Sequence, residues 1–184
     1  MGLLSSFPQD KIGVRIRPIA EEVIDKSYPW GYFDGSAAGG LKICGAGGLL
    51  FITDENIYTF KAGLDFGTNN YVELLGLKLL LILALDNHFK KLQIFGDSQL
   101  VINKATGKYQ IQNIQLAQIL LEVNRLSDMF ESVDFFHIYR ERNTLANVFA
   151  KYGSNVLSRS WQIFEHRSAM CFESLSFFKT WSIL

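Results

Sequence analysis

The sequence has 184 residues, of which 48% are hydrophobic, so the chain can bury one sizeable core and is not disordered throughout. Eighteen Lys and Arg balance eighteen Asp and Glu, which excludes the overall positive charge that marks many nucleic-acid-binding proteins. Cys44 and Cys171 have no metal-ligand spacing with each other or with a histidine. We therefore expect both cysteines to be reduced thiols of an intracellular protein. The sequence does not distinguish the nucleus from the cytoplasm. We expect no membrane partner.

Three strand-like segments follow an N-terminal arm, residues 1–29, that shows no sustained hydrophobic period. They are YFDGS at 32–36, ICGAGGLLFI at 43–52 and NIYTFKAG at 56–63, with glycine or turn-forming residues between them. Their short connections predict an antiparallel meander.

A long helix is expected next, over residues 69–86, because this segment is apolar on all sides apart from Glu73, Lys78 and its ends. Its most apolar part, residues 74–85, is too short to span a bilayer. The later pattern predicts a strand at 91–95, helices at 98–105 and 114–129, a strand at 133–138 and a helix near 143–152. The order βββαβααβα predicts an α/β fold, with a mixed five-stranded sheet that has helices on both faces.

These elements define one expected domain, residues 30–154. The remaining residues, 155–184, form an apolar tail that is rich in Ser, Phe and Trp. No helical or strand alternation is clear in this tail, so whether it is ordered stays open.

Three acidic residues border apolar elements. Asp34 lies in the first strand, Glu73 in the first turns of the long helix, and Asp97 directly after the fourth strand. A carboxylate beside apolar surface costs free energy unless it is paired or binds a cation. Taken singly, each of the three is also compatible with an ordinary capping or solvent-facing acid. We expect them to converge, because the order of elements places the first and fourth strands side by side.

The residues around these acids form four separated motifs: FDGS at 33–36, TNNYVE at 68–73, FGDSQLV at 95–101 and HIYRERNTLAN at 137–147. Together they resemble the type 1 ribonuclease H domain, especially the one found in plant non-LTR retroelement reverse transcriptase-related proteins. The resemblance implies the ribonuclease H-like fold. It also implies an endonuclease that hydrolyses the RNA strand of RNA/DNA hybrids.

The resemblance further implies two Mg²⁺ ions, with Mn²⁺ as an alternative, held by residues at the positions of Asp34, Glu73, Asp97 and Asn147. Oxygen ligands of this kind suit Mg²⁺. The family has an aspartate where this chain has Asn147. An amide offers a neutral oxygen and no negative charge, so we expect weaker binding of one ion and reduced activity.

Several polar residues stand where the family contacts the minor groove of the hybrid: Thr68, Asn69, Asn70, Ser98 and Gln99. Short polar groups there can read the 2′-hydroxyl, which separates RNA from DNA. Thr68 or Asn69 could equally cap the helix, and both roles can hold at once. A candidate backbone-contacting patch, or else a solvated loop, follows at Lys104, Lys108 and Tyr109.

His137 lies ten residues before Asn147, the offset of the family histidine that aids proton transfer or product release. Its place in a strand also suits a structural role, and Arg140 or Glu141 could stand near the site instead. Two functions compete: a retroelement-derived hybrid endonuclease, and a catalytically inactive nucleic-acid-binding relic, which Asn147 and the neutral net charge favour. Another nuclease of the same superfamily fits TNNxxE and DSQ poorly.

Overall fold

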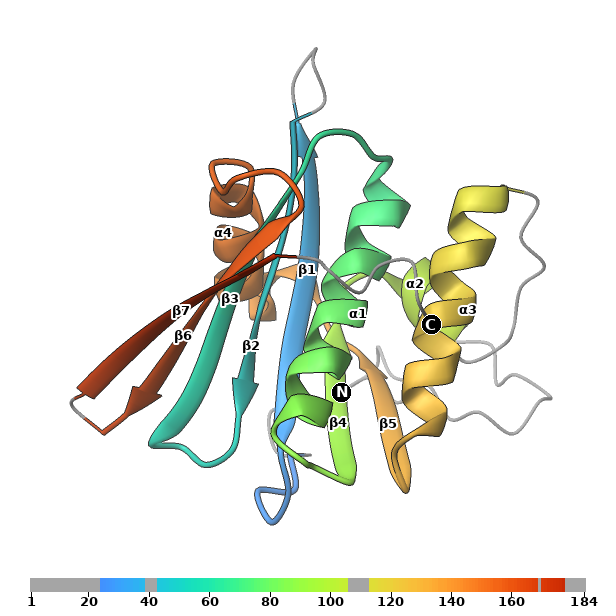
Figure 1. Ribbon diagram of the computed structural model, residues 1–184. Helices are drawn as coiled ribbons and strands as arrows, with labels where there is room; N and C mark the ends of the chain where they lie inside the picture. The colour runs from blue at the N-terminus through green and yellow to red at the C-terminus, as the bar shows by residue number, and fades with distance from the viewer. Residues whose placement is uncertain (1–23, 39–42, 106–112, 169, 178–184) are drawn as a thin grey trace, which may run out of the picture.

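A computed structural model describes residues 24–38, 43–105, 113–168 and 170–177, with the backbone alone for Ala38, Ile43, Lys104 and residues 173–177. Within these residues the chain forms one seven-stranded sheet, in the order β5-β4-β1-β2-β3-β6-β7 (Figure 1). Its first five strands are β1 (Trp30–Ala38), β2 (Ile43–Phe51), β3 (Asn56–Leu64), β4 (Lys91–Gly96) and β5 (Ser132–His137). β1, β2 and β3 pair antiparallel, whereas β4 runs parallel to both β1 and β5. The predicted mixed five-stranded core is confirmed.

The helices of the described chain are α1 (Asn69–Asp86), α2 (Gln99–Ala105), α3 (Ile114–Asp128) and α4 (Thr144–Gly153), with a 3₁₀ turn at Arg140–Arg142. Each begins and ends within one residue of its predicted range. The unbroken apolar run predicted α1, and the spacing of apolar residues predicted α3 and α4.

The core lies between the sheet and α1. This helix packs on β1 and β2, and it also packs against α3 (Figure 1). The leucines of α1 at positions 74, 75, 77, 79, 80, 81 and 83 are at most 3% exposed, and burying a leucine stabilises a fold by about 1.5–3 kcal/mol. Lys78 is buried as well, and its Nζ lies 2.5 Å from a carboxylate oxygen of Glu122 on α3. The helix therefore has no solvent-facing side, and its buried charge is paired.

α1 approaches β1 closely because two glycines leave room for backbone. A Cβ on Gly35 would lie 2.4 Å from the main-chain nitrogen of Glu73, and a Cβ on Gly76 would lie 2.6 Å from the main-chain oxygen of Asp34. Real Cβ atoms do not come so near to backbone atoms. The two glycines thus bring the start of α1, with Glu73, against the strand that carries Asp34.

α4 covers the other face of the sheet. A Cβ on Gly47 would lie 2.4 Å from the main-chain nitrogen of Ala150, so the helix backbone touches β2. Gly47 is the partner of Asp34 in the β1–β2 ladder. Because successive strand residues point to opposite faces, Asp34 faces α4 while Gly35 faces α1. Asp34 therefore lies between the two helices that approach the sheet.

The C-terminal tail continues the same sheet, a role that the sequence left open. β6 (Ser160–Arg167) pairs antiparallel with β3, and β7 (Met170–Phe177) pairs antiparallel with β6. Trp161 is 5% exposed and meets Phe60 edge-on, with ring centroids 5.9 Å apart. This buried tryptophan anchors the hairpin to the core, whereas residues 178–184 lie outside the described chain.

The end of the N-terminal arm is tied to β4 through the buried Gln93. The side-chain oxygen of Gln93 accepts from the backbone N–H of Asp25 at 3.0 Å, and its amide nitrogen donates to the backbone oxygen of Asp25 at 2.7 Å. Residues 1–23 of the arm lie outside the described chain. Among the described residues, no helix has the length and hydropathy needed to cross a membrane.

The close contact of α1 with β1 predicts that Gly35→Ala lowers the free energy of unfolding by about 1–3 kcal/mol, the usual cost of overpacking. The added Cβ meets backbone, so the helix must move rather than a side chain rotate. Urea unfolding of the metal-free protein measures the effect. Gly67→Ala is the matched control, because a Cβ there meets only side-chain atoms, at 3.1 Å or more. Equal losses in both variants would contradict this packing.

Candidate active site

The site forms where β1 and β4 separate. The parallel ladder between them ends at the pair Tyr32 and Phe95. Asp34 and Asp97 each follow two residues later, on the two sides of this opening. The carboxylates thus meet beyond the last paired residues, where no ladder fills the space between the strands.

Glu73 of α1 completes an acidic cluster with Asp34 and Asp97. One carboxylate oxygen from each of the three residues lies within 4.8 Å of the others. Asp34 is 4% exposed, and the other two side chains are partly buried. Like charges this close repel one another, and burial removes the water that would screen them. Hard oxygen ligands in this arrangement fit a divalent cation such as Mg²⁺.

The raised pKa values of two of these carboxyl groups also indicate a site for a cation. Burial raises the pKa of Asp34 and the charge of Asp97 adds to the rise, against hydrogen bonds from Asn147 and Gly35 and the charge of Arg140. Burial also raises the pKa of Glu73 to about 7, which a hydrogen bond from Ser98 opposes. Protons are therefore held at this site at a pH where free carboxylates have lost them, and a bound cation would displace them.

Asn147 of α4 is in direct contact with Asp34. Its Nδ2 donates to Oδ2 of Asp34 at 2.8 Å, while the other oxygen, Oδ1, accepts from the backbone N–H of Gly35 at 2.8 Å. Because a carboxylate only accepts hydrogen bonds, the amide must present its nitrogen to Asp34. Asn147 thus stands at the expected position, but it acts there as a hydrogen-bond donor.

His137 and Arg140 both stand near the cluster. His137 ends β5, and its Nε2 lies 3.1 Å from the main-chain oxygen of Asp97. Arg140 is exposed in the 3₁₀ turn, and its charge lowers the pKa of Asp34 and of Glu73. The fold therefore places near the cluster both His137 and Arg140, one of the two residues that the sequence offered in its place.

The residues expected to contact substrate flank the acids. Thr68 caps α1, since its Oγ1 accepts a hydrogen bond from the backbone N–H of Tyr71 at 3.3 Å. The side chain of Ser98 forms a hydrogen bond with the carboxylate of Glu73. Exposed or partly exposed side chains follow at Asn69, Asn70 and Gln99. The candidate patch cannot be placed in the same way: the side chain of Lys104, and the whole of Lys108 and Tyr109, lie outside the described chain.

Sequence reasoning missed Asn143, which precedes α4 and is only 2% exposed. Its Nδ2 donates to the main-chain oxygen of Phe33, the neighbour of Asp34, at 2.9 Å. An asparagine just before a helix is usually taken for a cap. Nothing in the sequence distinguishes a capping asparagine from one that reaches across to a strand.

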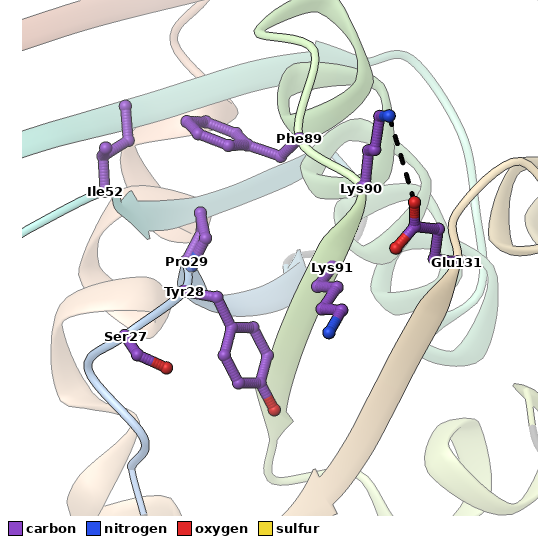
Figure 2. Close-up of a pocket in the computed structure, with 8 residues that line it drawn as sticks. All are labelled: Ser27, Tyr28, Pro29, Ile52, Phe89, Lys90, Lys91 and Glu131. Atoms are coloured by element: carbon purple, nitrogen blue, oxygen red, sulfur yellow. Dashed lines mark ion pairs between the residues drawn. The ribbon is translucent and has the colours of Figure 1, made fainter.

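A shallow pocket lies away from the cluster, where β1 and β4 begin. Figure 2 shows the residues that line it and the ion pair of Lys90 with Glu131, whose charged atoms are 3.9 Å apart. The pocket is lined by Ser27, Tyr28, Pro29, Ile52, Phe89, Lys90, Lys91 and Glu131. It contains none of the acids of the cluster, so it is not part of the candidate site.

A family model described as reverse transcriptase-like matches residues 32–153. The bifunctional protein Rv2228c of Mycobacterium tuberculosis is 24% identical over 133 residues, which are 69% of this chain and 35% of that protein. An uncharacterized protein of Mycobacterium bovis matches to the same extent. The chain thus spans only about a third, 35%, of the length of these relatives.

Among solved structures, RNase H1 from the halophilic archaeon Halobacterium salinarum superposes with a TM-score of 0.65 at 26% identity, covering 70% of this chain and 98% of that one. LC11-RNase H1, solved in complex with an RNA/DNA hybrid, superposes with a TM-score of 0.62 at 21% identity, covering 69% and 96%. At 21% identity, the similarity to LC11-RNase H1 shows a shared fold alone. Because the matched residues make up more than half of the chain, this protein belongs to the reverse transcriptase-like family and has an RNase H-like fold.

Proposed function

We propose that the chain is a retroelement-derived, metal-dependent endonuclease that hydrolyses the RNA strand of RNA/DNA hybrids. The observation that carries the proposal is the cluster of Asp34, Glu73 and Asp97, whose carboxylate oxygens lie within 4.8 Å of one another in an RNase H-like fold. The family description, reverse transcriptase-like, and the motifs shared with plant retroelement domains support its origin.

The residues of the cluster would hold the metal in unequal ways. Asp34 faces α4 and accepts hydrogen bonds from Gly35 and Asn147, which suits it to be the central ligand, with Glu73 and Asp97 beside it. A divalent ion bound there would supply a Lewis acid for phosphodiester hydrolysis. Asn147 adds no charge on its side of Asp34, so a second ion would bind there more weakly than in a site with four acids.

Recognition of a hybrid would fall to the polar groups beside these ligands. Asn69, Asn70 and Gln99 present amides at the ends of α1 and α2, next to Glu73 and Asp97 in the chain. Amides and hydroxyls can bond to 2′-hydroxyls without reading base edges. His137, at the main chain of Asp97, is the candidate for proton transfer or product release.

A second function, a binding domain without catalysis, is favoured by one observation. The amide of Asn147 donates to Asp34 where the family has a carboxylate, so one of the four acidic ligands is replaced by a hydrogen bond. Such a chain would still bind hybrids through backbone and 2′-hydroxyl contacts, and that binding would weaken with added salt.

We predict that the protein cleaves the RNA strand of a hybrid in Mg²⁺ and leaves duplex DNA intact, and that Asp34→Asn abolishes the cleavage. A neutral side chain at the central position cannot replace a charged ligand. The measurement is gel analysis of end-labelled hybrid and DNA duplexes. Asp65→Asn, which removes an exposed acid outside the cluster, is the matched control. Full activity in the Asp34 variant would reject the assignment.

Asn147→Asp should raise the cleavage rate and lower the Mg²⁺ concentration that gives half-maximal rate. The new carboxylate cannot donate to Asp34, and it adds a charged ligand on the same side. Mg²⁺ titrations of hybrid cleavage for both proteins test this, with thermal melts in chelator as a control for folding. Superimposable titrations of two active proteins would place Asn147 outside the metal site. No cleavage by either protein would favour the binding domain.

The raised pKa of Glu73 predicts how stability depends on pH without metal. Since the folded-state pKa of Glu73, about 7, lies above the ordinary glutamate pKa of 4.5, the folded state binds an extra proton between these two pH values. The free energy of unfolding should therefore fall as the pH rises from about 5 to about 7.5, by roughly 1–3 kcal/mol. Urea unfolding in chelator across this range measures it. Glu73→Gln should flatten the curve, and Mg²⁺ should restore stability at the high end; parallel curves for wild type and variant would contradict the assignment.

A further inference from the structure

Two asparagines, one within α4 and one at its N-cap position, reach the same strand at the acidic site. Asn147 donates to the carboxylate of Asp34. One turn earlier, Asn143 donates to the main-chain oxygen of Phe33, the residue directly before Asp34. One acceptor is a main-chain carbonyl and the other an ionised carboxylate, and neither can donate, so the orientation of both amides is determined by their surroundings. α4 is thus joined to consecutive residues of β1 through side chains at positions i and i+4, which lie on the same side of a helix.

While the side chain of Asn143 donates to Phe33, it makes neither a capping bond to α4 nor, within the described chain, a hydrogen bond through its own oxygen. Asparagine is among the preferred N-cap residues, yet its side chain makes no capping bond to α4. Its Oδ1 is buried and has no hydrogen-bond partner among the described residues. A buried acceptor without a partner is costly and rare in native proteins. The amide is therefore placed for its bond to Phe33 rather than for the stability of the helix.

The hydrogen bond from Asn143 reaches β1 just where this strand stops pairing with β4. β1 leaves β4 after Tyr32, so Phe33 is the first residue of β1 beyond the parallel ladder. From here on, the strand that carries Asp34 is held on this side by side chains and not by a neighbouring strand.

We propose that Asn143 is a positioning residue of the acidic site. It fixes the start of α4 to the backbone of β1, and so sets the place from which Asn147 orients the carboxylate of Asp34. The consequence for metal affinity rests on the proposed function, whereas the effect on Asn147 does not.

Asn143→Ser separates the two roles of Asn143, because serine caps a helix well but is too short to reach Phe33. Asn143→Asp keeps the size and capping capacity and replaces the donor by an acceptor. Leu145→Ala, on the same turn of α4 with an exposed side chain, is the matched control. Thermal melts of the full-length proteins accompany each measurement, so that a variant that fails to fold is recognised.

The first readout is the side-chain amide of Asn147 in ¹H–¹⁵N NMR spectra of the metal-free protein, assigned by its loss in Asn147→Asp. In both Asn143 variants we expect its shifts and exchange rate to move to those of a solvent-exposed amide, with no change in Leu145→Ala. An unchanged Asn147 signal in a folded Asn143 variant would overturn the proposal.

The second readout is Mn²⁺ affinity by calorimetry for wild type, Asn143→Ser, Asn147→Ala and the double variant. Directly linked residues couple measurably, so Asn143→Ser should weaken Mn²⁺ binding by about threefold or more alone and by clearly less when Asn147 is already alanine. The same factor in both backgrounds would show that Asn143 does not act through Asn147. Absence of Mn²⁺ binding by the wild type would count against the proposed function, while the NMR result would still decide the role of Asn143.

Discussion

Three carboxylates are held within 4.8 Å of one another in partly buried surroundings, and the fold supplies the force that keeps these like charges together. Backbone packs directly on backbone at Gly35 and Gly76, which carries Glu73 to the strand of Asp34, and this contact rests on the buried leucines of α1. Repulsion within the cluster is thus offset by hydrophobic packing elsewhere. A site of this kind is a cost to the folded protein until a cation binds.

The two faces of the sheet contribute in different ways. α1 supplies a carboxylate, Glu73, from one face, whereas α4 and its N-cap supply hydrogen bonds from Asn147 and Asn143 on the other. Asp34 is the residue where both contributions meet. A domain built in this way can lose the charge of its fourth position and keep the geometry of the other three, because the acids are held by β1, α1 and the end of β4, whereas the two amides come from α4 and its N-cap. The same arrangement explains why Asp34, Glu73 and Asp97 remain clustered although Asn147 stands where the family has an aspartate.

Much of this could be predicted from the sequence, because the signals were local. The apolar residues at 69–86 predicted the long helix, and the motifs around Asp34, Glu73 and Asp97, each beside an apolar strand or helix, predicted the acidic cluster. The tail was not recognised as strands, since Trp161 and Ile163 pack on the core while the rest of β6 mixes polar and aromatic residues that are only partly buried. The amide orientation of Asn147 and the reach of Asn143 depend on tertiary contacts with β1, which no periodicity encodes.

Asp34, Glu73 and Asp97 lie together in the fold, and we propose that they bind a divalent cation. A crystal structure of the protein grown with Mn²⁺, with anomalous scattering used to locate the metal, tests this proposal most directly. We expect an anomalous peak within coordination distance of carboxylate oxygens from all three residues, with Asp34 as the central ligand. No peak at the cluster at saturating Mn²⁺, or a peak bound only by other residues, would contradict this account.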